Sequence, residues 1–138
     1  MNNIIDRWRE WIGVFDRACE DDDWSRLAPF LTDDVVYAVI GAPFACELRG
    51  RDAVIAGFAK AIRNFDRKFD ERRWFGVGIR NSWEPNAVTG RAMGWYRIGD
   101  EAPITFSAKG LWLFRGDRLS VIVDVYDTTE HDVIRTLE

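Results

Sequence analysis

The stretch Leu119-Ser-Val-Ile-Val-Asp124-Val-Tyr-Asp127 has the clearest strand pattern in the chain and contains one residue that breaks it. Side chains alternate between the two faces of a strand. One face therefore carries Leu119, Val121, Val123 and Val125, and the other carries Ser120, Ile122, Asp124 and Tyr126. We expect both faces to be buried. A buried carboxylate is costly unless it is paired, hydrogen-bonded or protonated. Asp124 is therefore the main functional candidate, with a purely structural role as the alternative.

Three more extended segments precede this strand, at roughly 72–83, 87–98 and 104–114. Short polar turns at 84–86, 99–100 and 115–117 separate them, which predicts a long antiparallel meander. Glycines inside strands often mark bulges or bends. We expect a strongly curved sheet because such glycines recur here, at Gly76, Gly78, Gly90, Gly94 and Gly110.

The first half of the chain has helical periodicity. Apolar residues at helical spacing predict a helix over about 3–21 and a third helix from Gly50-Arg-Asp52 to about Phe69. Between them we expect a short helix through Trp24 and Pro29, capped by Asp22 or Asp23, then a strand at 33–40 and a loop at 41–47. Helices followed by sheet predict an α+β fold, a single-domain cone (an α+β barrel) over 1–138. In it the N-terminal helices pack in a strongly curved, mostly antiparallel sheet.

The segment at 87–98 has two contrasting faces. Gly90, Ala92 and Gly94 are small, whereas Arg91, Met93 and Trp95 are large. We expect the large side chains to point into the cone and the small ones to pack on a partner subunit. This predicts a homodimer formed through the open sheet face.

Composition excludes several classes of function. The 138 residues suit one domain, and the net charge of −4 argues against a nucleic-acid partner. The N-terminus is amphipathic and charged, so we expect neither a signal peptide nor membrane association. Two cysteines give no disulfide framework, which favours the cytoplasm.

Cofactor chemistry also lacks a sequence signal. The chain has one histidine, His131, in a polar segment that we expect to be exposed, and no Gly-rich phosphate loop. We therefore expect no metal and no other cofactor. Neither Cys19 nor Cys46 has a local base, which argues against nucleophilic catalysis.

The order of these elements resembles the nuclear transport factor 2-like superfamily, also called SnoaL-like, whose cone encloses a deep pocket. Three motifs are similar to those of its limonene-1,2-epoxide hydrolase group: Gly50-Arg-Asp-Ala-Val54, Thr89-Gly-Arg-Ala-Met93 and Val123-Asp-Val-Tyr-Asp127. The spacing between the last two, through Phe106-Ser-Ala-Lys-Gly-Leu-Trp112, also matches.

In that group two Asp residues bridged by an Arg open an epoxide, one as base and one as acid. The resemblance implies that Asp124 is the base, Arg91 the bridging Arg and Tyr37 the Tyr that helps to hold the water. Met93 stands where the acid should be, and a thioether cannot donate that proton. Val39 stands where an Asn should help to position the water, so the catalytic set is incomplete.

Other branches of the superfamily fit differently. Steroid isomerases use an Asp on the first strand, where this chain reads Val36-Tyr-Ala-Val39, whereas SnoaL-type polyketide cyclases rely mainly on one acid/base Asp in an apolar pocket. We expect a cofactor-independent enzyme (hydrolase, cyclase or isomerase) that acts on an apolar cyclic ligand. Asp124 would be its acid/base, Arg91 would set the ionisation of Asp124, and Tyr37 would be a hydrogen-bond partner. The alternatives are a non-catalytic ligand-binding module and a scaffold. The expected pocket lining is Val39, Met93, Trp95, Phe106, Ala108, Trp112, Ile122 and Tyr126.

Overall fold

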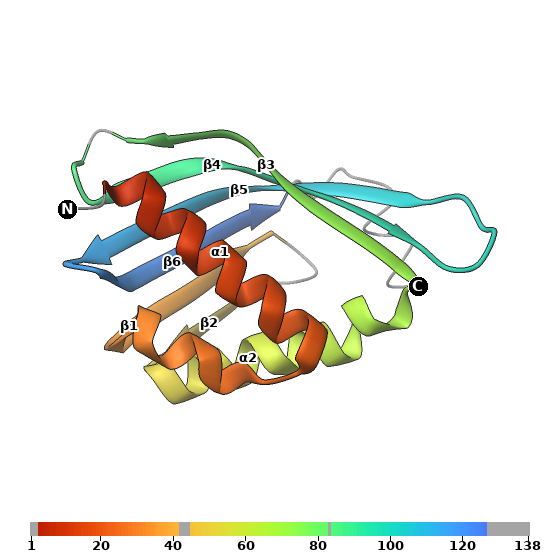
Figure 1. Ribbon diagram of the computed structural model, residues 1–138, viewed down its shortest axis with the longest axis horizontal. Helices are drawn as coiled ribbons and strands as arrows, with labels where there is room; N and C mark the ends of the chain where they lie inside the picture. The colour runs from red at the N-terminus through yellow and green to blue at the C-terminus, as the bar shows by residue number, and fades with distance from the viewer. Residues whose placement is uncertain (1–2, 42–44, 83, 127–138) are drawn as a thin grey trace.

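The computed structural model describes residues 3–41, 45–82 and 84–126. Its elements are α1 (Ile4–Asp21), the 3-10 helix η1 (Trp24–Phe30), β1 (Leu31–Ile40), β2 (Cys46–Arg49), α2 (Arg51–Asn64), the 3-10 helix η2 (Asp66–Lys68), β3 (Glu71–Asn81), β4 (Ala87–Arg97), β5 (Ile104–Arg115) and β6 (Arg118–Tyr126). Six strands form one curved, unclosed sheet in the order β2-β1-β6-β5-β4-β3, and the helices lie over one face of it (Figure 1). The predicted α+β fold is confirmed.

The predicted meander corresponds to β3 to β6, which pair antiparallel in chain order. β1 joins the meander by pairing parallel with β6, and β2 pairs antiparallel with β1. The loop predicted at 41–47 is partly wrong, because Cys46 and Glu47 belong to β2. Its four residues, Cys46-Glu-Leu-Arg49, alternate apolar and polar side chains, but so short a run is a weak strand signal. Pro43 and His131 lie outside the described residues.

The two long helices cover the sheet with aromatic and aliphatic side chains. Helix α1 begins at the Asn3 cap, whose side chain accepts a hydrogen bond from the Asp6 amide at 2.9 Å. Helix α2 ends at Asn64 and not near Phe69, because a break at Phe65 leads into η2. Among the described residues, neither helix is long and apolar enough to span a membrane. The core between the helices and the sheet includes Trp8, Trp11, Trp24, Leu27, Val54, Phe58, Ile62, Val88, Trp112 and Ile122.

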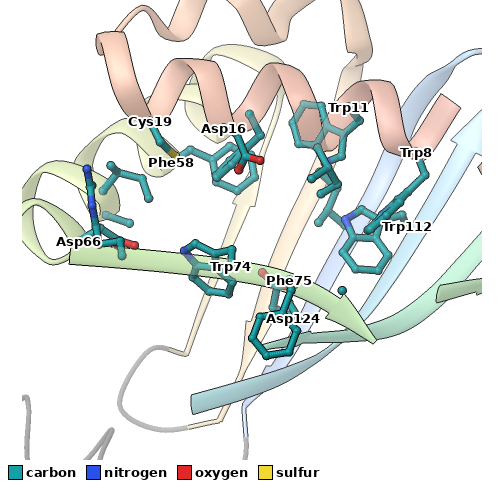
Figure 2. A pocket seen from close by; sticks show the side chains of 18 of the residues that line it. Trp8, Trp11, Asp16, Cys19, Phe58, Asp66, Trp74, Phe75, Trp112 and Asp124 are labelled. Atoms are coloured by element: carbon teal, nitrogen blue, oxygen red, sulfur yellow. The ribbon is translucent and has the colours of Figure 1, made fainter. Parts of the chain in front are cut away.

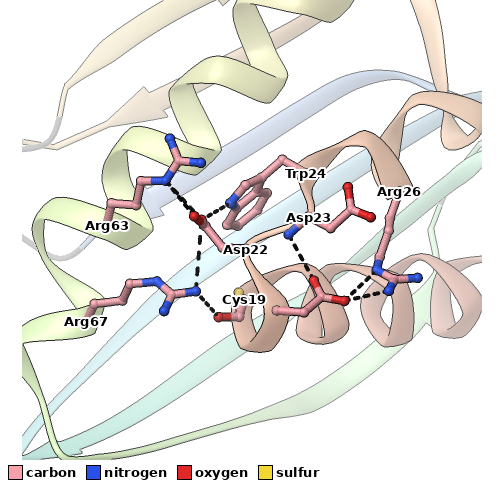
Figure 3. A network of polar contacts seen from close by, with 8 residues as sticks. Cys19, Asp22, Asp23, Trp24, Arg26, Arg63 and Arg67 are labelled. Carbon is pink, nitrogen blue, oxygen red and sulfur yellow. Dashed lines mark hydrogen bonds and ion pairs between the residues drawn. The ribbon is translucent and has the colours of Figure 1, made fainter.

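A polar network closes the corner after α1 (Figure 3). Asp22 has a left-handed backbone (φ 60°) and ends the helix. Its carboxylate accepts hydrogen bonds from Trp24 Nε1 at 2.8 Å and from Arg63 Nε at 2.9 Å. The expected capping bond is absent from Asp23, whose side chain instead accepts from Ser25 at 2.5 Å. The exposed network therefore sets the angle between α1, η1 and α2, and its ion pairs contribute little free energy.

The register reverses the expected orientation of β4. Residues directly opposed in adjacent strands share a face. Gly90 opposes Gly110, which opposes Asp124, and Ala92 opposes Ala108, which opposes Tyr126. The small side chains of β4 therefore point toward the helices, and Arg91, Met93 and Trp95 lie on the outer face. The predicted orientation is wrong.

The reason is space for large neighbours. A Cβ at Gly110 would lie 2.2 Å from Trp112 Cη2, one at Gly94 would lie 2.8 Å from Phe106 Cζ, and one at Gly90 would lie 2.3 Å from Ile79 Cδ1. These glycines let bulky side chains lie flat on the inner face of the sheet. The homodimer stays a prediction, although exposed apolar side chains such as Val77 and Val125 do lie on the outer face.

Candidate functional site

A cavity of about 760 Å³ lies between the helices and the inner face of the sheet (Figure 2). Helix α1 forms one wall and β3 forms the opposite edge. The lining is mostly aromatic, with Trp8, Trp11, Phe15, Tyr37, Phe58, Trp74, Phe75, Trp112 and Tyr126. This composition suits a small, largely apolar ligand.

Asp124 and Tyr37 meet in this cavity. They lie on the neighbouring strands β6 and β1, where Tyr37 is opposite Ile122 and Val39 is opposite Asp124. The Tyr37 hydroxyl donates a hydrogen bond to Asp124 Oδ2 at 2.6 Å. The parallel pairing of β1 with β6 therefore positions the predicted acid/base residue and its predicted hydrogen-bond partner together.

The electrostatics of the pair follow from burial. Burial raises the pKa of Asp124, and the hydrogen bond from Tyr37 opposes this without cancelling it. Burial, followed by the nearby charge of Asp124, raises the pKa of Tyr37 well above its usual value. Tyr37 therefore remains a protonated donor, whereas Asp124 can exchange a proton closer to neutral pH than an exposed Asp.

Aromatic rings surround the pair. The Trp112 indole lies over Gly110, the residue opposite Asp124 on β5. Trp8 packs edge-on against Trp112 with ring centroids 5.3 Å apart, and Phe58 lies 4.6 Å from the Tyr37 ring centroid. These rings exclude water from much of the carboxyl group, which accounts for the burial effect on its pKa.

Arg91 does not pair with Asp124. Its side chain is exposed, and its register places it on the outer face, where Arg91 Nη1 is 3.5 Å from Ser107 Oγ. Arg91 is nevertheless among the residues that border the cavity. The expected buried ion pair is therefore wrong, and within the described part of the chain only Tyr37 stabilises the Asp124 carboxylate.

The other expected pocket residues divide by face. Trp112, Ile122 and Tyr126 line the cavity. Val39, Phe106 and Ala108 are buried on the inner face but lie outside the cavity lining. Met93 and Trp95 are on the outer face, so Met93 does not occupy the position of a catalytic acid. Side chains one residue apart on a strand point to opposite faces, so the register with β5 decides which of these residues can reach the cavity.

A second carboxyl group in the cavity, Asp66, was not predicted. The Tyr96 hydroxyl donates a hydrogen bond to Asp66 Oδ2. Burial raises the pKa of Asp66 to about 6, despite the opposing effects of Tyr96 and Arg72. Asp66 occurs in a polar run after α2, and no sequence signal indicated that it would be buried.

The same end of the cavity contains Asp16 and Cys19 from α1. Burial, with a contribution from Glu20, raises the pKa of Asp16. Burial and the nearby Asp66 and Asp16 raise the pKa of the Cys19 thiol to about 12, which keeps it protonated and unreactive. No group of three His, Cys, Asp or Glu side chains in the described ranges could hold a metal ion.

Comparisons with known proteins identify the fold. No protein-family model and no curated protein matches the chain. A solved NTF2-like protein of unknown function from Burkholderia pseudomallei is 20% identical, with a TM-score of 0.69 over 99% of this chain and 98% of that one. A protein with a ketosteroid isomerase-like fold from Catenulispora acidiphila, in complex with trimethylamine, is 16% identical, with a TM-score of 0.63 over 88% of each chain.

An LEH-like epoxide hydrolase from M. tuberculosis is also similar. It is 20% identical, with a TM-score of 0.55 over 93% of this chain and 90% of that one. At these identities the likeness establishes the architecture, and the curved sheet with its enclosed cavity agrees with it. The chain has the fold of the nuclear transport factor 2-like superfamily.

Proposed function

We propose that this protein is a cofactor-independent enzyme that moves a proton on a small, apolar, cyclic substrate, with Asp124 as the acid/base. The observation that carries the proposal is the Tyr37–Asp124 hydrogen bond of 2.6 Å inside an aromatic cavity. A carboxyl group whose pKa is raised by burial is suited to exchanging protons near neutral pH.

The arrangement favours isomerisation or cyclisation over epoxide hydrolysis. Ionised Asp124 would remove a proton from an activated carbon of the substrate and return it to another atom, so one carboxyl group serves as base and then as acid. Tyr37 would stabilise the carboxylate and hold its orientation. Epoxide opening by the family route needs a second acid and a bridging Arg beside the base, and Met93 and Arg91 both lie on the outer face.

The test compares two substrate classes on one protein. We would measure conjugated product from cyclic β,γ-unsaturated ketones by absorbance, and diol formation from cyclic epoxides by chromatography. Replacing Asp124 by Asn should lower turnover by about two to four orders of magnitude while the protein stays folded. Asp100→Asn changes an exposed Asp in the same way and is the matched control. Undiminished turnover by folded Asp124→Asn would refute the proposal.

A non-catalytic binding module is the second candidate. It is favoured by the outward position of Arg91, which leaves Asp124 with no ion pair among the described residues. Such a module would raise its melting temperature with apolar cyclic ligands but release no product. Product formation that depends on Asp124 would exclude it.

A further inference from the structure

Two of the carboxyl groups that line the cavity each accept a hydrogen bond from a tyrosine. Asp124 is paired with Tyr37 from β1, and Asp66, just after α2, is paired with Tyr96 from β4. The proton-transfer proposal uses only the first pair. The second lines the same cavity and is almost as well enclosed.

A structural role for Asp66 alone explains its environment poorly. A carboxylate that anchors a fold is usually matched by a cation or by several donors, which lowers its pKa. The Tyr96 hydroxyl, the nearby Arg72 and a backbone hydrogen bond at Asp66 itself all lower the pKa of this carboxyl group, yet its loss of solvation outweighs them. A buried charge that is incompletely compensated is a marker of function.

The two pairs lie at different ends of the cavity. The β4 residue level with Asp124 is Gly90, and Tyr96 lies further along the same strand. At about 3.3 Å per residue the two levels are roughly 20 Å apart along the strand, before curvature and side-chain reach are considered. Figure 2 shows Asp66 and Asp124 on opposite sides of Trp74 in that view. One hydrogen-bonding group on a small ligand cannot reach both.

The charges near Asp66 indicate what it would accept. Asp16 and Glu20 on α1 line this end of the cavity, as does Arg72 on β3. Arg73 also borders the cavity but pairs with Glu71, and Arg67, near Cys19, pairs with Asp22 and donates to the Cys19 carbonyl. When ionised, the three carboxylates therefore outnumber Arg72, the lining cation at this end that has no such partner among the described residues. A ligand group that donates hydrogen bonds fits here, whereas an anionic group would be repelled.

We propose that Asp66, held by Tyr96, is a second binding subsite, so that the substrate is an elongated apolar molecule with a hydrogen-bond donor at the end away from Asp124. This inference rests on the proposed function, since it assumes that Asp124 and Tyr37 hold the reacting end. The aromatic walls between the two pairs would contact the ring system, and Asp66 would select its length.

Calorimetric titration with rigid phenols tests the subsite. The probes are 4,4′-dihydroxybiphenyl and 4,4″-dihydroxy-p-terphenyl, each compared with its monohydroxy analogue. For one of the two lengths, the second hydroxyl should tighten binding about tenfold, as expected for a hydrogen bond to a charged group. Replacing that hydroxyl by a carboxylate should weaken binding below that of the monohydroxy compound.

Variants assign the effects to the two ends. Asp66→Asn should remove both the gain from the second hydroxyl and the penalty from the carboxylate, and it should leave binding of the monohydroxy probe unchanged. Asp124→Asn should weaken binding of the monohydroxy probe, and Asp100→Asn should change nothing. Circular dichroism confirms that each variant is folded.

The outcomes separate the two proposals. If neither diphenol binds more tightly than its monohydroxy analogue, or if Asp66→Asn preserves the gain, the subsite is overturned while the role of Asp124 stands. If Asp124→Asn binds the monohydroxy probe as tightly as the wild-type protein does, the proposed role of Asp124 at the reacting end is overturned. If no probe binds, both are overturned.

Discussion

Replacing Asp66 by Asn should make the stability of the protein less dependent on pH. The folded-state pKa of Asp66 is raised from 3.8 to about 6, so the folded protein holds a proton that the unfolded chain has already lost. The stabilising contribution of this proton is fully present below about pH 4 and is lost as the pH rises through about 6. A difference of about 2 pKa units corresponds to about 3 kcal/mol in the free energy of unfolding. In Asp66→Asn the group cannot ionise, and the Tyr96 hydroxyl can still donate to the amide oxygen.

Urea denaturation followed by tryptophan fluorescence, at several values between pH 4 and pH 8, would measure this effect. The difference between wild type and Asp66→Asn isolates one group, because every other titration is common to both proteins. The variant should gain up to about 3 kcal/mol relative to wild type as the pH rises from 4 to 7, most of it between pH 4 and 6. Asp100→Asn should show no such trend. Parallel stability curves for wild type and Asp66→Asn would refute the reasoning.

Two further substitutions test the other end of the cavity. Gly110→Ala places a Cβ 2.2 Å from Trp112 Cη2, so it should displace that indole, cost about 1–3 kcal/mol of stability and weaken apolar ligand binding. Gly13→Ala is the control, because no neighbouring atom lies within 4 Å of the added Cβ, and it should stabilise helix α1 by up to about 1 kcal/mol. If urea denaturation gave the same change in stability for Gly110→Ala and Gly13→Ala, the packing argument would be contradicted. Tyr37→Phe removes the hydrogen bond that favours ionised Asp124 and so raises the pKa of that carboxyl group. The low-pH limb of the pH–rate profile, where turnover rises as Asp124 ionises, should therefore shift to higher pH. An unchanged profile would show that Asp124 does not act as the base.

The sequence predicted the elements well because their signals are local. The helical spacing that includes Trp8 and Trp11 marks α1, and the regular turns mark the meander. Which face of β4 points inward could not be predicted, because the signal depends on partners in other strands. From the sequence, Gly90 was interpreted as part of a small surface for a partner subunit and Gly110 as a mark of sheet curvature. In the structure these two glycines make room for Ile79 and Trp112.

The same distinction applies to the site. Asp124 could be singled out because a carboxylate in an aliphatic strand is a local anomaly, and Tyr37 through the resemblance; the structure brings the two together, and their catalytic roles stay a prediction. The predicted pairing of Arg91 with Asp124 was wrong because adjacent residues on a strand face opposite sides. A weak motif match can therefore place the expected residue type on the wrong face of the sheet. Asp66 was missed because its burial depends on Tyr96, 30 residues away in the sequence.

The parallel pairing of β1 with β6 has a consequence for folding kinetics. Tyr37 and Asp124 are separated by 87 residues, whereas the strands of the meander are joined by short turns. The loop-closure entropy of the long connection must be overcome before its contacts are formed, so hairpins between sequential strands form earlier along the folding pathway. We therefore expect the Tyr37–Asp124 hydrogen bond to form after the folding transition state. Substitutions that remove it should act mainly on the unfolding rate. The proposed proton transfer would then be available only to chains that have finished folding.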